Sequence, residues 1–236
     1  MPALLTDVQL AALAAWPSPA IANAIETFDV RSRSAGFTTP DIVCRFPDLP
    51  PIVGYAATAK IRADIPPAAD PDAVSVLEWH AFIETIPAPR IIVIQDLNQP
   101  PLGSFWGEVN GNVHRALGAI GLITDGGVRD LDEVEELGFQ FLSREILVSH
   151  AYVHLVEFGH PVTVGGLTVH PGDLLHADKH GAILIPHDIA VGVAGAAQTV
   201  ENTERIIIDY CQSDSFTREG LAKLMGAQRP RAQEIP

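Results

Sequence analysis

The chain has 236 residues, of which 47% are hydrophobic and 19% charged, and this composition predicts one globular domain with a sizeable core. Its formal net charge of −14 argues against a nucleic-acid partner, because affinity for a polyanion depends on basic side chains that neutralise phosphates. The two cysteines form no CxxC pair, and no apolar run approaches the ~20 residues of a membrane span, so we expect a cytoplasmic protein that does not contact a membrane.

The N-terminal part is expected to contain two helices and then a buried strand. Residues 5–15 are rich in Ala and Leu and predict a helix, which a Pro-Ser-Pro sequence interrupts, so that Ser18 can cap a second helix over residues 20–28. Small and apolar residues alternate over residues 52–61 and predict a strand. We therefore expect the helices at about residues 5–30 to be an appendage of the main domain.

A second pair of elements is predicted before the centre of the chain. Residues 73–83 have helical periodicity, and the apolar run at residues 90–96 is typical of a buried parallel strand. Asp96 lies where this strand ends. It is either a turn former, which is the more frequent role of Asp at such a position, or part of a ligand site.

The central part of the chain predicts a helix, a strand and another helix in succession. Helical spacing after Gly107 predicts a helix that ends at Gly118, because a glycine at the C′ position readily adopts the left-handed conformation. The β-branched run at residues 119–124 predicts a buried strand, and residues 125–127 predict a turn. Residues 131–138 predict an amphipathic helix with a closing glycine. Ligands bind such sheets at the carboxyl ends of strands and at helix N-termini.

Three polar residues flank this central strand. Twenty residues separate Glu108 from the adjacent pair Arg129-Asp130. Two carboxylates and a guanidinium can hold a divalent cation beside an anionic substrate. A surface ion pair beside a turn is the alternative explanation of Arg129 and Asp130, and the spacing to Glu108 argues against it.

A second motif lies downstream of the first. It consists of Gly165-Gly166, Pro171-Gly172-Asp173, Ala177-Asp178, Gly181 and Pro186. Together the two motifs resemble the RraA-like family, which joins the regulator of ribonuclease E activity A to class II aldolases that release pyruvate from 4-hydroxy-4-methyl-2-oxoglutarate and 4-carboxy-4-hydroxy-2-oxoadipate. The resemblance covers roughly residues 15–190.

The resemblance implies a fold and an assembly. From the residues alone we expect a mixed α/β protein with a β-rich middle, and the resemblance implies a three-layer β/β/α swivelling domain. It also implies a homotrimer or a dimer of trimers, with active sites between subunits. We treat residues 1–236 as one domain, with C-terminal helices at about residues 195–226 as a second appendage. In the family's aldolases a Glu from a neighbouring subunit completes the metal shell, and Glu201 and Glu204 are both candidates because no motif chooses between them.

The resemblance further implies roles for the site residues. Asp130 is expected to bind the divalent metal, with Mg²⁺ preferred and Mn²⁺ as an alternative, because Mg²⁺ uses one or two carboxylates and keeps several waters. Arg129 is expected to bind the oxygens of the 2-oxo acid and to stabilise the enolate. Glu108 would orient a metal-bound water or act through it as general acid and base. The backbone N–H groups of Val109 and Asn110 would bind the substrate carboxylate.

Three histidines have alternative interpretations. His150 and His154 have the i, i+4 spacing of a zinc-binding helix, but the Glu of a metalloprotease motif is missing between them, and the sequence is equally compatible with a strand. His114 lies on the predicted helix after Gly107. We expect it at the surface, and contact with substrate is the alternative.

A second histidine group lies in the downstream motif. His176, Asp178 and His180 alternate with other residues, so on a strand they would share one face. Asp178 belongs to the family motif, and we expect it to form a turn. Two amphipathic helices are predicted beyond this motif, over residues 200–211 and 216–225.

The predicted function is a divalent-metal-dependent lyase that cleaves a C–C bond of a 4-hydroxy-2-oxo acid and releases pyruvate. Oxaloacetate decarboxylation is also expected, since loss of CO₂ generates the same pyruvate enolate. No lysine is placed to form a Schiff base, which argues against a class I aldolase. The alternative is a non-enzymatic regulator that binds a ribonuclease or another protein, as the family includes such inhibitors.

Overall fold

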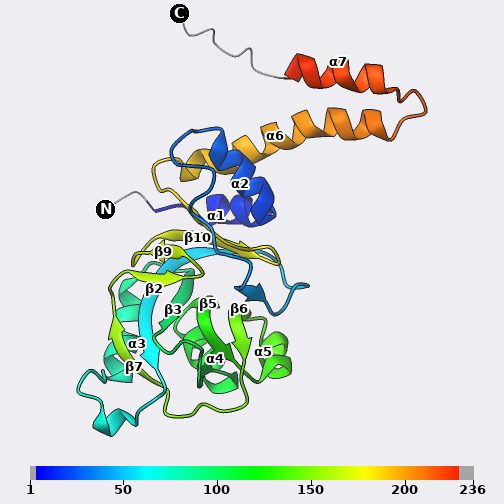
Figure 1. The fold of residues 1–236 in the computed structure, drawn as a ribbon. Helices are drawn as coiled ribbons and strands as arrows, with labels where there is room; N and C mark the ends of the chain where they lie inside the picture. The colour runs from blue at the N-terminus through cyan, green and yellow to red at the C-terminus, as the bar shows by residue number, and fades with distance from the viewer. Residues whose placement is uncertain (1–3, 229–236) are drawn as a thin grey trace, which may run out of the picture.

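The structure is a computed structural model that describes residues 4–228. Within these residues, nine strands form one sheet in the order β1-β6-β5-β3-β2-β10-β11, with β4 paired to β5 and β7 paired to β2 (Figure 1). β2, β3, β5 and β6 pair in parallel, and β10 and β11 are antiparallel to their neighbours. The strands are β1 (Val43–Cys44), β2 (Ile52–Arg62), β3 (Arg90–Asp96), β4 (Ser104–Trp106), β5 (Ala119–Val128), β6 (Gln140–Ile146), β7 (His154–Phe158), β10 (Leu174–Asp178) and β11 (Gly181–Ile185).

The helices form two groups. One group lies against the parallel part of the sheet, and α1 and α2 pack with α6 near β10 (Figure 1). The hairpin of α6 and α7 extends away from the sheet. The first group is α3 (Val76–Thr85), α4 (Glu108–Ala116) and α5 (Leu131–Leu137); the second is α1 (Asp7–Ala14), α2 (Ser18–Glu26), α6 (Ala190–Cys211) and α7 (Arg218–Gln228). A short 3₁₀ helix, η1, covers Pro67–Ala69.

The side chains of β3 point alternately to the two faces of the sheet, and a separate layer packs on each face. Successive side chains of a strand point to opposite faces, so Ile92 and Ile94 pack with Trp79 of α3. Ile91 and Val93 belong to a second apolar cluster, which includes the hairpin of β8 (Val162–Val164) and β9 (Leu167–Val169). The hairpin, the sheet and the helices therefore form three layers, and the predicted β/β/α class is confirmed.

The turn predicted at residues 125–127 is wrong, because these residues belong to β5. Gly127 pairs with Ser104 of β4 and with Glu145 of β6, so hydrogen bonding continues past the apolar run. The register with β6 shifts between Thr124 and Gly127, which accommodates the glycine-rich sequence within the strand. The helix ends predicted at Gly118 and Gly138 are confirmed, with φ of 77° and 70°.

His114 is fully buried, so the expected surface position is wrong. Trp79 donates its indole N–H to Nε2 of His114 at 3.0 Å, and Nδ1–H of His114 donates to the carbonyl of Asn110 at 2.7 Å. Burial lowers the pKa of His114 to about 4, which keeps the ring neutral at neutral pH. The ring also lies against Trp106, 4.4 Å between centroids, so His114 is a core residue that links α3, α4 and β4.

The second histidine group anchors the N-terminal helices. Ser18 is the first residue of α2, but its hydroxyl bonds to Nδ1 of His176 at 2.9 Å instead of capping the helix. Its backbone N–H donates to Asp178 at 2.9 Å, and Nε2–H of His176 donates to the carbonyl of Trp16 at 2.8 Å. Asp178 also accepts the backbone N–H of His180, so the predicted turn role of Asp178 is confirmed.

The C-terminal helix predicted over residues 200–211 begins earlier than expected, at Ala190, because small residues at its start pack against α2. Glu201 pairs with Arg205 on the same helix, and Glu204 accepts a hydrogen bond from Asn23 at 3.4 Å. A role for either Glu in a neighbouring subunit stays a prediction.

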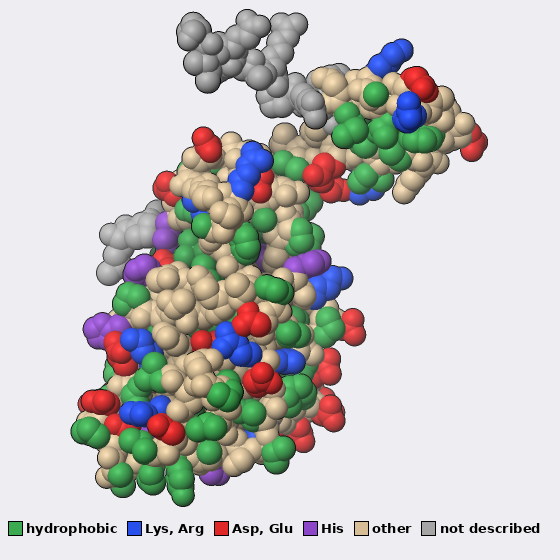
Figure 2. Space-filling model, in the orientation of Figure 1, with side chains coloured by type: hydrophobic (Ala, Val, Ile, Leu, Met, Phe, Trp, Pro, Cys, Tyr) green, Lys and Arg blue, Asp and Glu red, His purple; other side chains and the backbone are tan. Residues whose placement is uncertain are grey.

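None of the helices in residues 4–228 combines the length and hydropathy that a bilayer-spanning helix needs. On the face shown in Figure 2, Lys and Arg side chains lie among Asp and Glu side chains and not in one continuous patch.

Candidate active site

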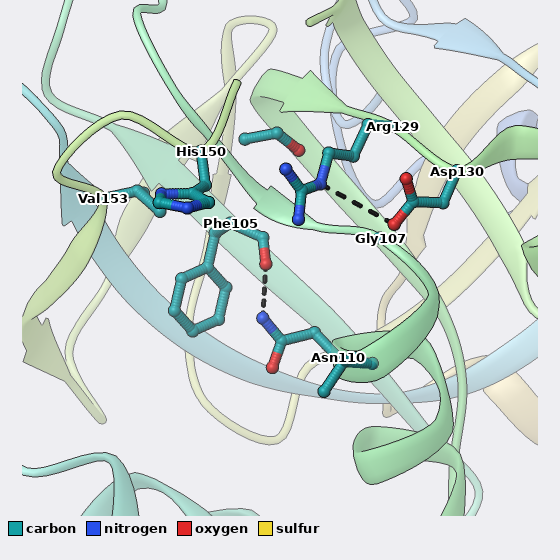
Figure 3. A pocket seen from close by; sticks show the side chains of 9 residues that line it. Phe105, Gly107, Asn110, Arg129, Asp130, His150 and Val153 are labelled. Atoms are coloured by element: carbon teal, nitrogen blue, oxygen red, sulfur yellow. Dashed lines mark hydrogen bonds and ion pairs between the residues drawn. The ribbon is translucent and has the colours of Figure 1, made fainter. Parts of the chain in front are cut away.

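A cavity of about 260 Å³ lies where β4, the start of α4 and the end of β5 meet (Figure 3). β4 and β5 run parallel, with Trp106 opposite Val128, so the residues that follow both strands lie at the same edge of the sheet. The loop between β6 and β7 forms another side. The cavity is lined by Ser104, Phe105, Gly107, Val109, Asn110, Arg129, Asp130, His150 and Val153.

Arg129 and Asp130 lie directly between β5 and α5. The backbone N–H of Arg129 donates to the carbonyl of Trp106 at 3.0 Å, which extends the pairing of β4 and β5. Asp130 has φ 54° and ψ 50°, a left-handed conformation that is uncommon for residues other than glycine. Its carbonyl accepts the N–H of Val134 and starts α5. This sharp reversal directs the two side chains into the cavity, and such strained residues cluster at functional sites.

The Asp130 carboxylate is held on one side only. Its Oδ2 accepts the backbone N–H of Glu108 at 3.0 Å and lies 3.6 Å from Nε of Arg129. Its Oδ1 has no hydrogen-bonding partner within residues 4–228, and the side chain is 37% exposed. The carboxylate is therefore oriented by the protein while one oxygen remains available to a ligand.

Gly107 makes this arrangement possible. A Cβ atom at position 107 would overlap Oδ2 of Asp130, so the close approach of the carboxylate to the start of α4 requires glycine. The sequence motif included this glycine without indicating why it is needed.

We expect Gly107→Ala to displace the Asp130 carboxylate and to lower the rate of the reaction at this site by about 10²-fold, since small misplacements of catalytic groups have effects of this order. The thermal unfolding midpoint should change little, because the clash involves a partly exposed side chain. Gly195→Ala is the matched control. No atom lies within 4 Å of the added Cβ, so this helical substitution should leave activity unchanged. Equal activity of Gly107→Ala and wild type would contradict the proposed position of Asp130.

Glu108 contributes its backbone to the site. Its N–H binds Asp130, and its carbonyl accepts a hydrogen bond from Asn112 at 2.9 Å. Its side chain is exposed and is not among the cavity-lining side chains. The structure thus brings Arg129 and Asp130 together in the cavity, with the Glu108 carboxylate outside it.

The N-terminus of α4 offers hydrogen-bond donors to the cavity. No described residue accepts a hydrogen bond from the N–H groups of Val109 and Asn110, as expected in the first turn of a helix. The side chain of Asn110 donates to the carbonyl of Phe105, which closes the loop before the helix. Free N–H groups and the helix dipole make such a terminus suitable for a carboxylate.

The histidines of the i, i+4 pair have separate environments. His150 lies in the loop between β6 and β7 and lines the cavity, whereas His154 begins β7 and contacts Oδ2 of Asp70 at 2.9 Å. The segment is a loop followed by a strand, so the two rings do not share a face, and the zinc-helix interpretation is wrong. The i, i+4 spacing marked His150 as a candidate ligand, but only the tertiary fold places His150 and Arg129 in the same cavity.

The cavity can supply one carboxylate ligand to a divalent cation. No group of three His, Cys, Asp or Glu side chains positioned to hold a metal ion is found in residues 4–228. The available Oδ1 of Asp130 can act as one carboxylate ligand. Mg²⁺ usually keeps several waters and binds through one or two carboxylates together with its substrate, so this donor set fits Mg²⁺ or Mn²⁺ better than Zn²⁺.

Asp96 lies outside the cavity. Its Oδ1 accepts the N–H of Asn98 at 2.8 Å, which confirms the turn-forming interpretation, and its backbone N–H donates to Asp125 at 2.8 Å. Asp96 is 2% exposed, and its Oδ2 has no hydrogen-bond partner in the described residues. Burial, together with the charge of Asp125, raises the pKa of Asp96 to about 6.

The raised pKa of Asp96 predicts a pH-dependent difference in stability between the wild-type protein and an Asp96→Asn variant. Between an unfolded pKa of about 3.9 and the folded value of about 6, the folded state binds more protons than the unfolded state. The free energy of unfolding of the wild-type protein therefore decreases as pH rises through this window. The free energy of unfolding of Asp96→Asn relative to wild type should therefore increase by about 2 kcal/mol from pH 4 to pH 7. Urea titrations at both pH values measure it, with the exposed Asp48→Asn as control. A difference that is constant with pH would refute the prediction.

Comparison with known proteins now identifies the family. Residues 19–184 match the sequence model of the RraA-like family, which is described as Aldolase/RraA. The chain belongs to the RraA-like family. This family includes aldolases and ribonuclease E inhibitors, and the resemblance seen in the motifs is confirmed.

Individual relatives are distant. The chain is 26% identical over 136 residues to a putative 4-hydroxy-4-methyl-2-oxoglutarate aldolase of Halalkalibacterium halodurans, covering 57% of this chain and 60% of that protein. The alignments span less than two thirds of the length of the curated relatives that the chain matches. An uncharacterised protein from Pseudomonas syringae has a TM-score of 0.72, with 23% identity over 96% of this chain and 97% of that one. RraAS2 of Streptomyces coelicolor has a TM-score of 0.67, with 20% identity over 86% and 98%. These structural similarities establish the fold.

Proposed function

We propose that this RraA-like protein is a divalent-metal-dependent lyase that releases pyruvate from a small 2-oxo acid by class II retro-aldol cleavage, and that it also decarboxylates oxaloacetate. The observation that carries the proposal is a cavity that brings three features together. These are the guanidinium of Arg129, the Asp130 carboxylate with its available Oδ1, and the free backbone N–H groups at the start of α4. Membership in a family that includes aldolases supports the same chemistry.

Each group has a role in binding or charge stabilisation. The N–H groups of Val109 and Asn110 bind the substrate carboxylate, and the planar guanidinium of Arg129 orients the keto acid and stabilises negative charge as the C–C bond breaks. Asp130 holds the metal. When bound there, a divalent cation supplies Lewis-acid stabilisation of the developing enolate charge. A water-orienting role of the exposed Glu108 carboxylate stays a prediction.

The cavity is small and combines a guanidinium with free backbone N–H groups, which favours a short dianionic substrate over a large apolar one. Arg129 is the cationic side chain among the nine cavity-lining residues, so it pairs naturally with one carboxylate, while the helix N-terminus accommodates another. The homotrimer or dimer of trimers that the family resemblance implies is part of the proposal.

A substrate panel tests the function. Purified protein is incubated with oxaloacetate and with several 4-hydroxy-2-oxo acids, in the presence of Mg²⁺ or Mn²⁺, and the pyruvate formed in excess of a protein-free blank is measured with lactate dehydrogenase. We expect pyruvate from at least one 4-hydroxy-2-oxo acid and from oxaloacetate. Pyruvate from oxaloacetate alone would restrict the function to decarboxylation, and the absence of pyruvate with every compound would refute the lyase assignment.

A further inference from the structure

His150 is an acid–base group that faces the cavity and has no assigned role there. It lines the cavity together with Arg129 and Asp130, and Figure 3 shows it on the side of the Arg129 guanidinium that is opposite Asp130. The Glu108 carboxylate, by contrast, does not line the cavity. Among the cavity-lining residues, His150 carries the imidazole ring, whose two nitrogens can donate and accept a proton.

The structure fixes the tautomer of His150. Its Nδ1 lies 2.7 Å from the backbone carbonyl of Ala151. A carbonyl oxygen only accepts, so Nδ1 carries the proton, and in the neutral ring Nε2 carries a lone pair. This leaves Nε2 ready to take a proton from a bound hydroxyl group and to return it later.

The loop that carries His150 is held in place by its backbone. Ser104 of β4 donates its N–H to the carbonyl of Ser149 at 3.0 Å, and Val153 donates to the carbonyl of His150 at 3.0 Å. A Cβ atom at Gly103 would overlap the His150 carbonyl, so the loop depends on a glycine for its close approach. Ala151 has φ 46°, a left-handed conformation that a non-glycine residue adopts only when its surroundings impose it.

We propose that His150 is the general base and acid of the retro-aldol step. The inference rests on the proposed function and deepens it. Nε2 removes the proton from the C4 hydroxyl of the substrate while the C3–C4 bond breaks. The C4–O bond becomes a carbonyl, and the electron pair of the broken bond forms the enolate of pyruvate. Nε2–H then donates the same proton to C3, which gives pyruvate and restores the neutral imidazole, so no external oxidant or reductant is required.

This role predicts a difference between two reactions at one site. Retro-aldol cleavage requires removal of a hydroxyl proton before or during C–C cleavage. Decarboxylation of oxaloacetate has no such proton to remove, and solvent can protonate the enolate. A loss of His150 should therefore impair the first reaction much more than the second.

His150→Asn is the primary variant, because its side-chain N–H can still donate to the Ala151 carbonyl while Nε2 is lost. We expect kcat for the 4-hydroxy-2-oxo acid to fall by about 10²- to 10⁴-fold, the range for general acid–base catalysis, and oxaloacetate decarboxylation to change by less than about threefold. His170→Asn is the matched control, since His170 is exposed and lies outside the cavity. It should match wild type in both reactions.

Chemical rescue provides a second readout. His150→Gly leaves space at an exposed position of an open cavity, and added imidazole should restore retro-aldol cleavage in proportion to its concentration while leaving decarboxylation unchanged. Equal losses in both reactions, or no loss of retro-aldol activity in His150→Asn, would overturn the assignment of His150 while leaving the lyase function intact. Absence of pyruvate from wild type with all substrates would instead overturn the proposed function, and with it this inference.

Discussion

Replacing Asp130 with Asn is expected to reduce kcat/KM for pyruvate release by about 10³-fold or more, since metal-assisted charge stabilisation contributes several kcal/mol to such reactions. The Asn side chain can still accept the N–H of Glu108, so the start of α4 should keep its position. What is lost is the negative charge beside the available Oδ1. The effect should appear in both retro-aldol cleavage and decarboxylation, because both generate the same enolate.

Asp132→Asn is the matched control for this variant. Asp132 lies two residues away on α5, is exposed and does not line the cavity. Its replacement by Asn therefore removes the same charge from outside the cavity. Its kinetic constants should equal those of wild type. An Asp130→Asn variant that keeps full activity would show that the metal binds elsewhere or that no metal is used. If the chain acted only by binding a protein partner through its outer surface, that function would survive Asp130→Asn.

Replacing Arg129 with Lys is expected to lower kcat/KM by about 10²- to 10³-fold, a magnitude typical of the loss of a preorganised group that stabilises developing negative charge. Lysine keeps the charge but lacks the planar fork that binds two oxygens at once, so it is not a conservative replacement at such a site. It also loses the contact of Nε with Oδ2 of Asp130, at 3.6 Å. Both kcat and KM should worsen, because in the proposed mechanism the guanidinium binds the substrate and the transition state.

Steady-state kinetics with oxaloacetate measures this change, and Arg205→Lys is its control. Arg205 lies on α6, pairs with Glu201 and is exposed, so its replacement should leave the reaction unchanged. A change in KM alone for Arg129→Lys would limit Arg129 to uniform substrate binding and would remove it from charge stabilisation.

Much of the fold was predictable because local signals agreed with tertiary packing. The apolar run at Arg90–Asp96 became β3 with the predicted ends, since a continuous β-branched sequence is suited to a strand that is buried on both faces. Gly118 and Gly138 ended their helices as expected, because a positive φ is a local requirement of the backbone. The motif spacing also predicted that Arg129 and Asp130 would be adjacent to the start of α4.

The remaining features depend on partners that are distant in sequence. His114 is buried because Trp79, 35 residues away, provides a hydrogen bond to its ring, and no local pattern reveals this. The spacing of His150 and His154 was compatible with a zinc-binding helix or with a strand, and the pairing of β7 with β2 places His154 in a strand. The need for glycine at position 107 arises from the return of Asp130 to the start of α4, which is a property of the assembled site.

The most direct test of the central claim is the release of pyruvate from oxaloacetate by protein from which EDTA has removed divalent metal, followed by addition of Mg²⁺. Asp130→Asn with Mg²⁺ serves as the blank, because free Mg²⁺ alone accelerates this decarboxylation to some extent. We predict no enzymatic rate after EDTA treatment, and a rate that returns with Mg²⁺ in wild type but not in Asp130→Asn. A rate that persists in EDTA, or that is equal in both proteins, would contradict a metal-dependent lyase site at Arg129 and Asp130.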